Sequence, residues 1–320
     1  MNVLVVGATG AVGKRLVPLL RDSGHRVVGT TTSCTKASEI RALGAEPVVL
    51  DVLDEAAVLR TVWEASPDAI VHEATALARF TNVRKFDDEF ALTNRLRREG
   101  TDNLLAAARE AGVKRFVAQS FAGWPFARAG SLLKDESAPL DPDPPKNARR
   151  TLAAIEHLER AVTGADRLEG IVVRYGGLYG PGTSLDEGGP QYAAIKKRRV
   201  PIVGNGSGMW SFVHVDDAAG ATVSAVERGR RGIYNIVDDE PAPASEWLPY
   251  LAEALGAKPP RRVPEWLARL VAGEQAVSMM TQARGAANAK AKRELAWKPR
   301  YATWREGFLG APVEKAEFAA

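Results

Sequence analysis

The chain begins with a short apolar run that leads directly into a glycine-rich turn. Val3 to Val6 are all aliphatic, and the next seven residues read Gly-Ala-Thr-Gly-Ala-Val-Gly. A buried parallel strand has such a continuous apolar sequence. After it, Gly7 permits a tight turn, Gly10 lets the backbone approach a pyrophosphate, and Gly13 lets the following helix pack closely. The free N–H groups at that helix start favour phosphate, so we expect a dinucleotide site rather than an ordinary tight turn. The expected contacts in this turn are Gly7, Thr9, Gly10, Ala11, Val12 and Gly13.

Strand and helix patterns alternate through the first half of the chain. Strands are expected at 3–6, 26–29, 47–50, 69–72, 115–119 and 170–174, and helices at 12–23, 37–43, 54–64, 86–111 and 149–162. This rhythm predicts an α/β fold with a doubly wound parallel sheet, the Rossmann fold, with right-handed crossovers. We expect a dinucleotide-binding domain over 1–180, to which the chain returns around 208–240. A smaller, mostly C-terminal α/β substrate-binding part is expected over 181–320.

Composition narrows the class of protein. The 320 residues include 43 basic and 39 acidic ones, and the net charge is only +4. The basic clusters at 149–150 and 196–199 are short, so no nucleic-acid partner is expected. The single Cys34 excludes an internal disulfide framework, and no His/Cys spacing suits a metal. No apolar run is long enough to span a membrane, and the first strand leaves no room for a signal peptide. We therefore expect a cytoplasmic protein that acts on a small molecule, and a homodimer is left open.

Several segments together resemble the extended short-chain dehydrogenases/reductases of the NAD(P)-dependent epimerase/dehydratase type. The matching segments are 7–13, 51–54, 71–76, 93–94, 100–105, 116–120, 175–182, 211–217 and 289–295. The resemblance covers nearly the whole chain and implies an enzyme that binds NADP or NAD. Beyond the glycine turn, it implies that cofactor contacts come from Thr31, Thr32, Asp51, Val52, Ala74, Thr75, Ala76, Asn94, Tyr175 and Leu178.

One part of the family pattern is missing. The family's acid/base is a Tyr-x-x-x-Lys pair on the helix after the strand that delivers a catalytic Ser or Thr. The alignment of residues 150–156 with that helix puts Ala148 where Tyr belongs and Leu152 where Lys belongs. Moving the register does not help, because the first tyrosine of the chain is Tyr175. Tyr192 and Lys196 have the right spacing, but they follow the sixth strand, and we interpret them as part of a substrate-domain helix.

Two residues are the candidates for catalysis. Ser120 ends a strand on the cofactor side and is expected to bind a substrate oxygen, although a capping role is the alternative. Tyr179 lies in a glycine-rich segment near the expected nicotinamide, where it could donate a proton or only line the substrate. We interpret His214 as a structural histidine. An apolar or aromatic ligand is suggested by Trp124, Phe126, Met209, Trp210, Met279 and Met280, for which core packing is the alternative.

The end of the second strand bears on cofactor preference. An NAD-specific site has an acid there for the ribose hydroxyls. The chain has Thr31 at that position, followed by Thr32, with Lys36 nearby. Hydroxyls tolerate a 2′-phosphate better than a carboxylate would, so NADP is preferred over NAD.

Three functions remain open at this stage. The first is an NAD(P)-dependent oxidoreductase of epimerase/dehydratase type that acts on a small carbonyl, alcohol or natural product with non-standard proton transfer. The second is a non-redox isomerase, cyclase or lyase in which bound NAD(P) is structural. The third is a dinucleotide-binding sensor without catalysis. The missing pair argues against ordinary dehydrogenase chemistry, and the substrate-domain segments argue against a pure sensor.

Overall fold

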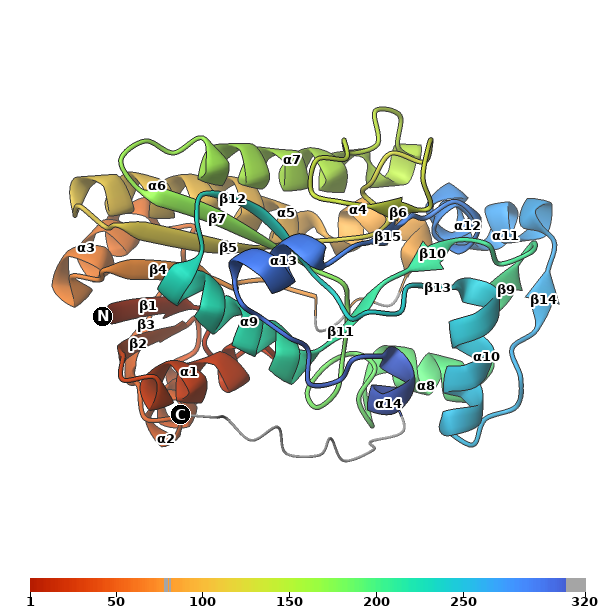
Figure 1. Ribbon diagram of the computed structural model, residues 1–320, viewed down its shortest axis with the longest axis horizontal. Coiled ribbons are helices and arrows are strands. Elements are labelled where there is room, and N and C mark those ends of the chain that lie inside the picture. Colours follow the sequence, from red (N-terminus) through yellow and green to blue (C-terminus); the bar gives the residue numbers. More distant parts are fainter. Residues whose placement is uncertain (78–79, 81, 309–320) are drawn as a thin grey trace.

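The computed structural model describes residues 1–77, 80 and 82–308. A seven-stranded parallel sheet runs through the larger part of the molecule in the order β12-β7-β5-β4-β1-β2-β3 (Figure 1). Its strands are β1 (Asn2–Val6), β2 (Arg26–Thr31), β3 (Glu46–Val49), β4 (Ala69–His72), β5 (Arg115–Phe121), β7 (Glu169–Tyr175) and β12 (Gly232–Ile236). The strand order reverses between β1 and β4, and ligands of open α/β sheets bind at the carboxyl ends beside such a point.

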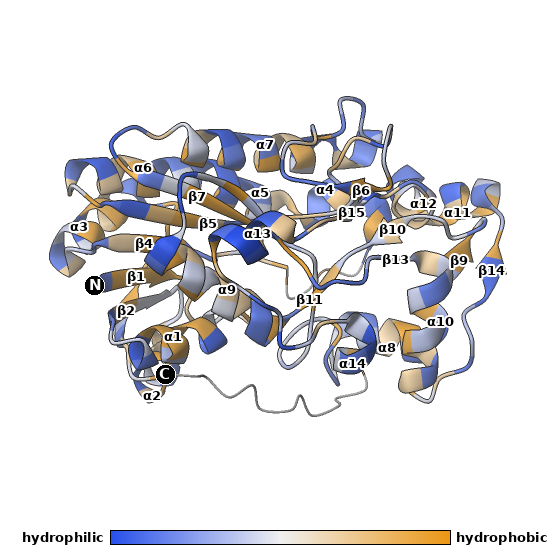
Figure 2. Ribbon diagram, viewed as in Figure 1, coloured by the Kyte–Doolittle hydropathy of each residue, from blue (hydrophilic) through white to orange (hydrophobic). Residues whose placement is uncertain are grey.

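Helices cover both faces of this sheet. On one face lie α1 (Gly13–Asp22) and α9 (Val215–Arg228), and on the other lie α3 (Glu55–Ala65), α6 (Thr101–Glu110) and α7 (Arg149–Thr163). Side chains alternate along a strand, so Val3 and Val5 join the first core while Leu4 and Val6 join the second. The central strands are largely hydrophobic along their length (Figure 2). The expected doubly wound Rossmann fold is confirmed.

The helical region after β4 differs from the single helix expected over 86–111. It contains η2 (Val83–Lys85), α4 (Phe86–Glu89), α5 (Ala91–Arg95), a π-helical turn η3 (Leu96–Gly100) and then α6. A π turn admits one extra residue into a helix, and such turns are frequent at functional sites. Gly100 fits here because a Cβ at this position would lie 2.9 Å from a methyl group of Val52. Residues 97–103 contain no aliphatic or aromatic side chain, so hydrophobic periodicity gives no signal of the turn.

The smaller part consists of two-stranded ribbons and short helices. The ribbons pair β8 (Gly177–Tyr179) with β11 (Phe212–His214), β9 (Ile202–Val203) with β14 (Arg262–Val263), β10 (Met209–Trp210) with β13 (Ala242–Pro243), and β6 (Leu133–Lys134) with β15 (Gly285–Ala286). Its helices include α8 (Pro190–Lys196), α10 (Ala244–Ala254), α11 (Glu265–Ala272), α12 (Glu274–Thr281) and α14 (Trp304–Phe308). Their core is aromatic and contains Tyr179, Phe212, Trp247 and Trp304. The remaining elements are η1 (Cys34–Lys36), α2 (Ala37–Ala42), η4 (Lys146–Ala148) and α13 (Ala289–Glu294).

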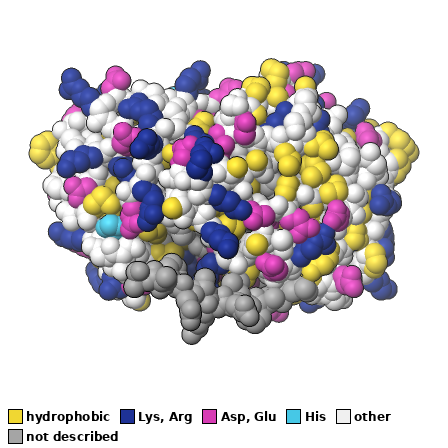
Figure 3. Space-filling model, viewed as in Figure 1, with side chains coloured by type: hydrophobic (Ala, Val, Ile, Leu, Met, Phe, Trp, Pro, Cys, Tyr) yellow, Lys and Arg dark blue, Asp and Glu magenta, His cyan; other side chains and the backbone are white. Residues whose placement is uncertain are grey.

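Three properties of the described part of the chain bear on possible partners. None of the helices among the described residues is long and apolar enough to cross a bilayer. On the face seen in Figure 3, basic and acidic side chains are interspersed rather than gathered into one basic patch. Within the described ranges, no group of three or more His, Cys, Asp or Glu side chains is arranged to hold a metal ion.

Candidate functional site

The glycine turn after β1 forms a cradle that other residues would fill. Gly7 has a φ of +90°, and a Cβ there would lie 2.9 Å from the backbone nitrogen of Ala74. A Cβ on Gly13 would lie 2.3 Å from the Gly7 carbonyl oxygen, so this position requires glycine. Gly10 is exposed, and its missing Cβ points to open space apart from the Gly7 oxygen at 3.2 Å. No side chain caps the start of α1, which follows Val12. The turn therefore fits a pyrophosphate at a helix N-terminus.

The end of β2 offers hydroxyls and no carboxylate to this cradle. The Thr9 hydroxyl lies 3.5 Å from that of Thr31, which also accepts a hydrogen bond from the Ser33 N–H at 3.3 Å. Thr31 is buried, whereas Thr32 is exposed. Lys36 is exposed in the turn η1. A ribose here would meet neutral oxygen atoms.

The loop after β3 supplies the next edge of the site. The exposed Asp51 carboxylate accepts a hydrogen bond from the Leu53 N–H at 3.0 Å, and this bond shapes the loop. Val52 is buried, and its carbonyl accepts a hydrogen bond from the Asn103 side chain at 2.9 Å. These contacts tie the loop to α6 and leave the Asp51 backbone at the carboxyl end of the sheet.

The loop after β4 runs from Glu73 to Ala76 between the glycine turn and α5. The Glu73 N–H donates to the Val6 carbonyl at 2.9 Å, and the Ala76 N–H donates to the Thr93 hydroxyl at 3.0 Å. Ala74 and Thr75, which lie between these anchors, are half-buried. The loop is therefore held at both ends and presents small residues to the cleft.

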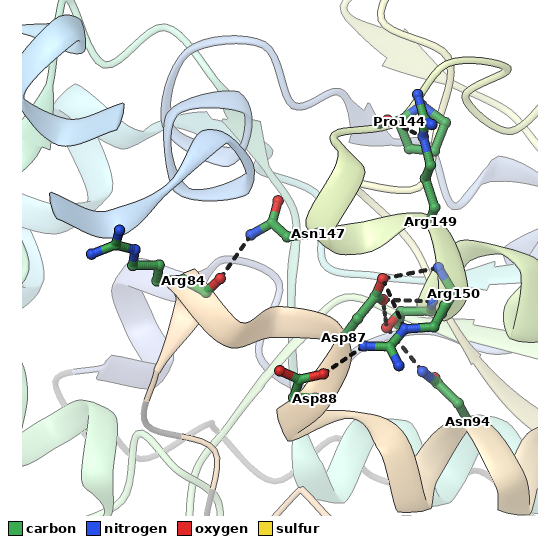
Figure 4. A network of polar contacts seen from close by, with 9 residues as sticks. Arg84, Asp87, Asp88, Asn94, Pro144, Asn147, Arg149 and Arg150 are labelled. Atoms are coloured by element: carbon green, nitrogen blue, oxygen red, sulfur yellow. Dashed lines mark hydrogen bonds and ion pairs between the residues drawn. The ribbon is translucent and has the colours of Figure 1, made fainter. Parts of the chain in front are cut away.

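Helix α7 is held at its start by a carboxylate from α4 (Figure 4). Asp87 accepts hydrogen bonds from the N–H of Thr151 at 2.8 Å, from the Thr151 hydroxyl at 2.7 Å and from the N–H of Arg150 at 3.0 Å. A negative charge at a helix N-terminus is stabilising. Asn94, an expected cofactor contact, instead donates its side-chain amide to the Thr151 hydroxyl at 3.1 Å. Its amide oxygen is buried and has no hydrogen-bond partner among the described residues.

The sequence of α7, RRTLAAIEHLERAVT, contains neither tyrosine nor lysine. Ala148 just before it is fully buried, and Leu152 is only 3 % exposed. The two positions at which the family has its acid/base pair are therefore apolar and buried in this protein. Tyr192 and Lys196 do contact each other, at 3.3 Å, but they lie on α8 in the smaller part.

The Ser120 hydroxyl is directed toward α7. It is 2 % exposed and donates a hydrogen bond of 2.7 Å to Glu159. Glu159 also accepts two hydrogen bonds from the Arg174 guanidinium, at 2.7 and 2.5 Å. This buried ion pair employs both carboxylate oxygens. A catalytic role for Ser120 stays a prediction, and the geometry supports a positioning role beside the ion pair.

The two tyrosines named from the sequence are both buried. The Tyr179 ring packs edge-on to His214 and Phe308, its hydroxyl has no hydrogen-bond partner among the described residues, and burial raises its pKa. A phenol held so firmly in its protonated form is a poor proton donor at neutral pH. Leu178, next to it, is half-buried. Tyr175 faces α9, where its hydroxyl contacts Glu73 and Thr222. Only the Tyr175 backbone is thus available at the strand end.

Burial changes the charge of Glu73 beneath the glycine turn. Its Oε1 accepts a 2.8 Å hydrogen bond from the Tyr175 hydroxyl, and its Oε2 has no partner. Burial raises the pKa of Glu73 to about 8, and the bond from Tyr175 opposes this shift. The carboxyl is therefore largely neutral at pH 7. The sequence does not reveal this role of Glu73, because a polar residue directly after a strand gives no sign that its side chain is buried in the core.

An apolar pocket opens beyond the end of β5. Its lining residues are Phe121, Ala122, Gly123, Trp124, Met209, Trp210, Ser211, Met279 and Ala283. Four of the six residues expected to face the cleft belong to this set. The other two do not: Phe126 is buried beneath the Arg174 guanidinium, and Met280 packs in the core of the smaller part. The rings of Phe121, Trp124 and Trp210 line it, but these side chains leave a space of only about 10 Å³, far less than an aromatic ligand occupies.

The comparisons with known proteins agree with this architecture. The family model described as "NAD dependent epimerase/dehydratase family" matches residues 3–237. A "3-diazoavenalumate denitrifying reductase" from Streptomyces sp is 45% identical, over 96% of this chain and 99% of the relative. A "4-hydroxy-2-methyl-3-oxo-4-farnesyl-3,4-dihydroquinoline-1-oxide ketoreductase" from Stigmatella aurantiaca is 31% identical, over 81% of this chain and 74% of the relative. A crystal structure of the UDP-glucose 4-epimerase of Thermotoga maritima has a TM-score of 0.76 at 23% identity, and the match covers 97% of this chain and 96% of that one.

The chain belongs to the NAD-dependent epimerase/dehydratase family. It is an enzyme of the short-chain dehydrogenase/reductase kind, as the family and the reductase-named relatives show. The resemblance seen in the sequence is confirmed, and so is the broad expectation of an NAD(P)-linked oxidoreductase.

Proposed function

We propose that the protein is a reductase that uses NAD(P)H to remove a diazo group from an aromatic carboxylate and releases the nitrogen as N2. The observation that carries this proposal is that α7 contains neither tyrosine nor lysine, in a chain that is 45% identical to a diazo-compound reductase over almost its full length. The aromatic part of the substrate class comes from the name of that relative.

The missing acid/base pair fits this chemistry. Hydride transfer to a carbonyl also requires a proton for the oxygen, whereas a positively charged diazonium group does not. When bound, reduced nicotinamide supplies a hydride, and a diazonium that accepts it gives a neutral diazene, which collapses to the C–H product and N2 without net proton uptake. This reaction therefore needs no acid/base pair at Ala148, just before α7, and Leu152, within it. The buried Tyr179 need not give up its proton either.

We propose that the dinucleotide lies along the carboxyl ends of β1 to β5. The pyrophosphate would rest on the glycine turn and the uncapped start of α1. The remaining contacts would come from Thr31, Thr32, Asp51, Val52, Ala74, Thr75, Ala76, Asn94 and the backbone of Tyr175 and Leu178. The hydroxyls of Thr9 and Thr31 favour NADPH over NADH, because no carboxylate there repels a 2′-phosphate.

The test uses two matched probes, 4-carboxybenzenediazonium carrying ¹⁵N and 4-acetylbenzoate. They share a benzoate and differ in having a diazonium or a ketone. We expect loss of the reduced-nicotinamide absorbance with the diazonium, together with ¹⁵N-labelled N2 detected by mass spectrometry. Turnover of the ketone alone would make the chain a ketoreductase. Turnover without any change in nicotinamide absorbance would favour a non-redox enzyme instead.

A further inference from the structure

Arg97 is a buried cation on the π turn η3 with unused hydrogen-bond donors. The side chain is 4 % exposed, and its Nε and Nη1 atoms have no hydrogen-bond partner among the described residues. Burial lowers the pKa of Arg97 to about 10, so the guanidinium is still charged at neutral pH. A buried charge without a partner is strongly unfavourable, and buried cations are normally paired with anions.

The guanidinium lies near an aromatic ring earlier in the same helical region. Its Cζ atom lies 6.0 Å from the centre of the Phe90 ring, which is seven residues or about two helical turns earlier in the chain. Helical side chains point toward the N-terminus of their helix, which agrees with this position. At that level, Thr93 accepts the hydrogen bond from Ala76 in the loop after β4. Arg97 therefore reaches the layer directly beneath that loop.

The carboxylates nearest to Arg97 are already committed. Glu159 attracts Arg97 electrostatically, but its two oxygens accept hydrogen bonds from Ser120 and Arg174. Asp87 is occupied by the start of α7 (Figure 4). The amide oxygen of Asn94 is one helical turn from Arg97 and also has no partner. Within the described residues, no carboxylate is hydrogen-bonded to Arg97, and the buried group of Glu159, Arg174 and Arg97 carries one more positive than negative charge, which an anionic ligand would balance.

We propose that Arg97 binds an anionic oxygen group, a phosphate or a carboxylate, of a ligand held between the loop after β4 and the start of α7. This inference rests on the proposed function, because the two sources of such a group are the dinucleotide and the carboxylate substrate. A guanidinium with two free donors binds either group through paired, charge-assisted hydrogen bonds.

The test compares Arg97→Met with Arg98→Met. Arg98 is the next residue on the same turn and is exposed, so its variant removes the same charge outside the site. We would measure the unfolding temperature of each variant without ligand. We would also measure the dissociation constant of NADPH, and that of 4-acetylbenzoate with and without NADP. We expect Arg97→Met to keep or raise the unfolding temperature, because an apolar residue replaces an unpaired buried charge. It should lower the affinity for one of the two ligands at least about tenfold, while Arg98→Met changes neither affinity by more than about twofold.

The outcomes tell whether the anion belongs to the cofactor or to the substrate, and whether Arg97 has only a structural role. Weaker NADPH binding assigns the anion to a cofactor phosphate, and weaker 4-acetylbenzoate binding assigns it to the substrate carboxylate. A lower unfolding temperature with unchanged affinities would show that Arg97 is structural and would overturn the inference. If Arg97→Met does not fold, Arg97→Lys replaces it in the same measurements. A role in anion binding predicts that Arg97→Lys weakens ligand binding only in part, because it keeps the charge. A purely structural role predicts that Arg97→Lys leaves the affinities unchanged. If the wild type binds no dinucleotide, the proposed cofactor site fails, while the carboxylate measurement still tests Arg97.

Discussion

Ser120 on β5 and Glu159 on α7 are 39 residues apart, and a 2.7 Å hydrogen bond joins the serine hydroxyl to the glutamate. The bond fixes the buried carboxylate that also pairs with Arg174. The serine expected to face the substrate thus lies against the helix that covers the sheet. Its contribution to rate and to stability can be measured separately.

Ser120→Ala is predicted to act mainly on stability. A hydroxyl that binds a developing oxyanion is worth on the order of 10²–10³ in rate, whereas one neutral-to-charged hydrogen bond is worth about 1.5–3 kcal/mol of stability. Because Ser120 is 2 % exposed and bonded to Glu159, we expect kcat to change less than about tenfold and the unfolding temperature to fall by several degrees. Steady-state kinetics on a folded variant are the measurement, with Tyr192→Phe as the control. A loss of kcat above a hundredfold for Ser120→Ala alone would restore the catalytic role.

Gly10→Glu is predicted to abolish dinucleotide binding. The side chain would enter the exposed cradle above the Gly7 carbonyl and add a negative charge where the pyrophosphate lies. Gly220→Glu adds the same charge on α9, where a Cβ meets no atom within 4 Å, and serves as the matched control. Calorimetric titration with NADPH checks both variants. Unchanged affinity in a folded Gly10→Glu protein would move the site elsewhere.

Thr31→Asp is predicted to reverse the cofactor preference. The new carboxylate would repel a 2′-phosphate and accept hydrogen bonds from the ribose hydroxyls of NADH. We expect the ratio of NADPH to NADH dissociation constants to rise by about tenfold or more, which corresponds to about 1.4 kcal/mol. A wild-type protein that already binds NADH much more tightly than NADPH would contradict the NADP preference.

Glu73 is predicted to make the protein less stable as the pH rises. Its folded pKa of about 8 lies above the ordinary value of 4.5, so the folded state keeps a proton that the unfolded chain has lost. Its stabilising contribution is complete below about pH 4.5 and is lost progressively up to about pH 8. Urea unfolding between pH 5 and about 8 measures the slope, which Glu73→Gln should flatten.

The control for this slope is Glu253→Gln, which changes an exposed glutamate on α10. Part of the wild-type slope should remain in Glu73→Gln, because burial also raises the pKa of Asp238 to about 8 and that of Asp217 to about 6. An identical slope in wild type and Glu73→Gln would show that Glu73 does not titrate in this range.

Asp87→Ala is predicted to destabilise the protein by about 2–3 kcal/mol. The change removes the carboxylate that accepts three hydrogen bonds at the start of α7 and leaves the buried Thr151 without its partner. Asp88→Ala removes only an exposed ion pair with Arg150 and should cost less than about 1 kcal/mol. Urea titrations of the two variants give the difference. Equal losses of unfolding free energy in the two variants would show that the Asp87 carboxylate does not stabilise the start of α7.

Much of the cofactor half could be predicted because its signals are local. The apolar run of β1 and the glycines after it have backbone requirements that neighbouring residues alone impose, and Gly7 and Gly13 occupy the positions expected of them. The break of the helix at η3 could not be predicted, because residues 97–103 carry no aliphatic or aromatic side chain in which a change of helical phase would show. Asp87 could not be predicted as a cap, since it acts on a helix that lies 63 to 64 residues further along the chain.

The sequence by itself determined the order of strands and helices and the kind of turn that follows β1, because apolar periodicity and glycine act over a few residues. Tertiary structure alone decided where the polar side chains of the strand ends point. Ser120 turned to Glu159 and Tyr175 to Glu73 because residues at a strand end alternate between two packed faces. It also decided that Arg97 is buried without a counter-charge, because burial depends on which helices pack around it and those helices come from distant parts of the chain.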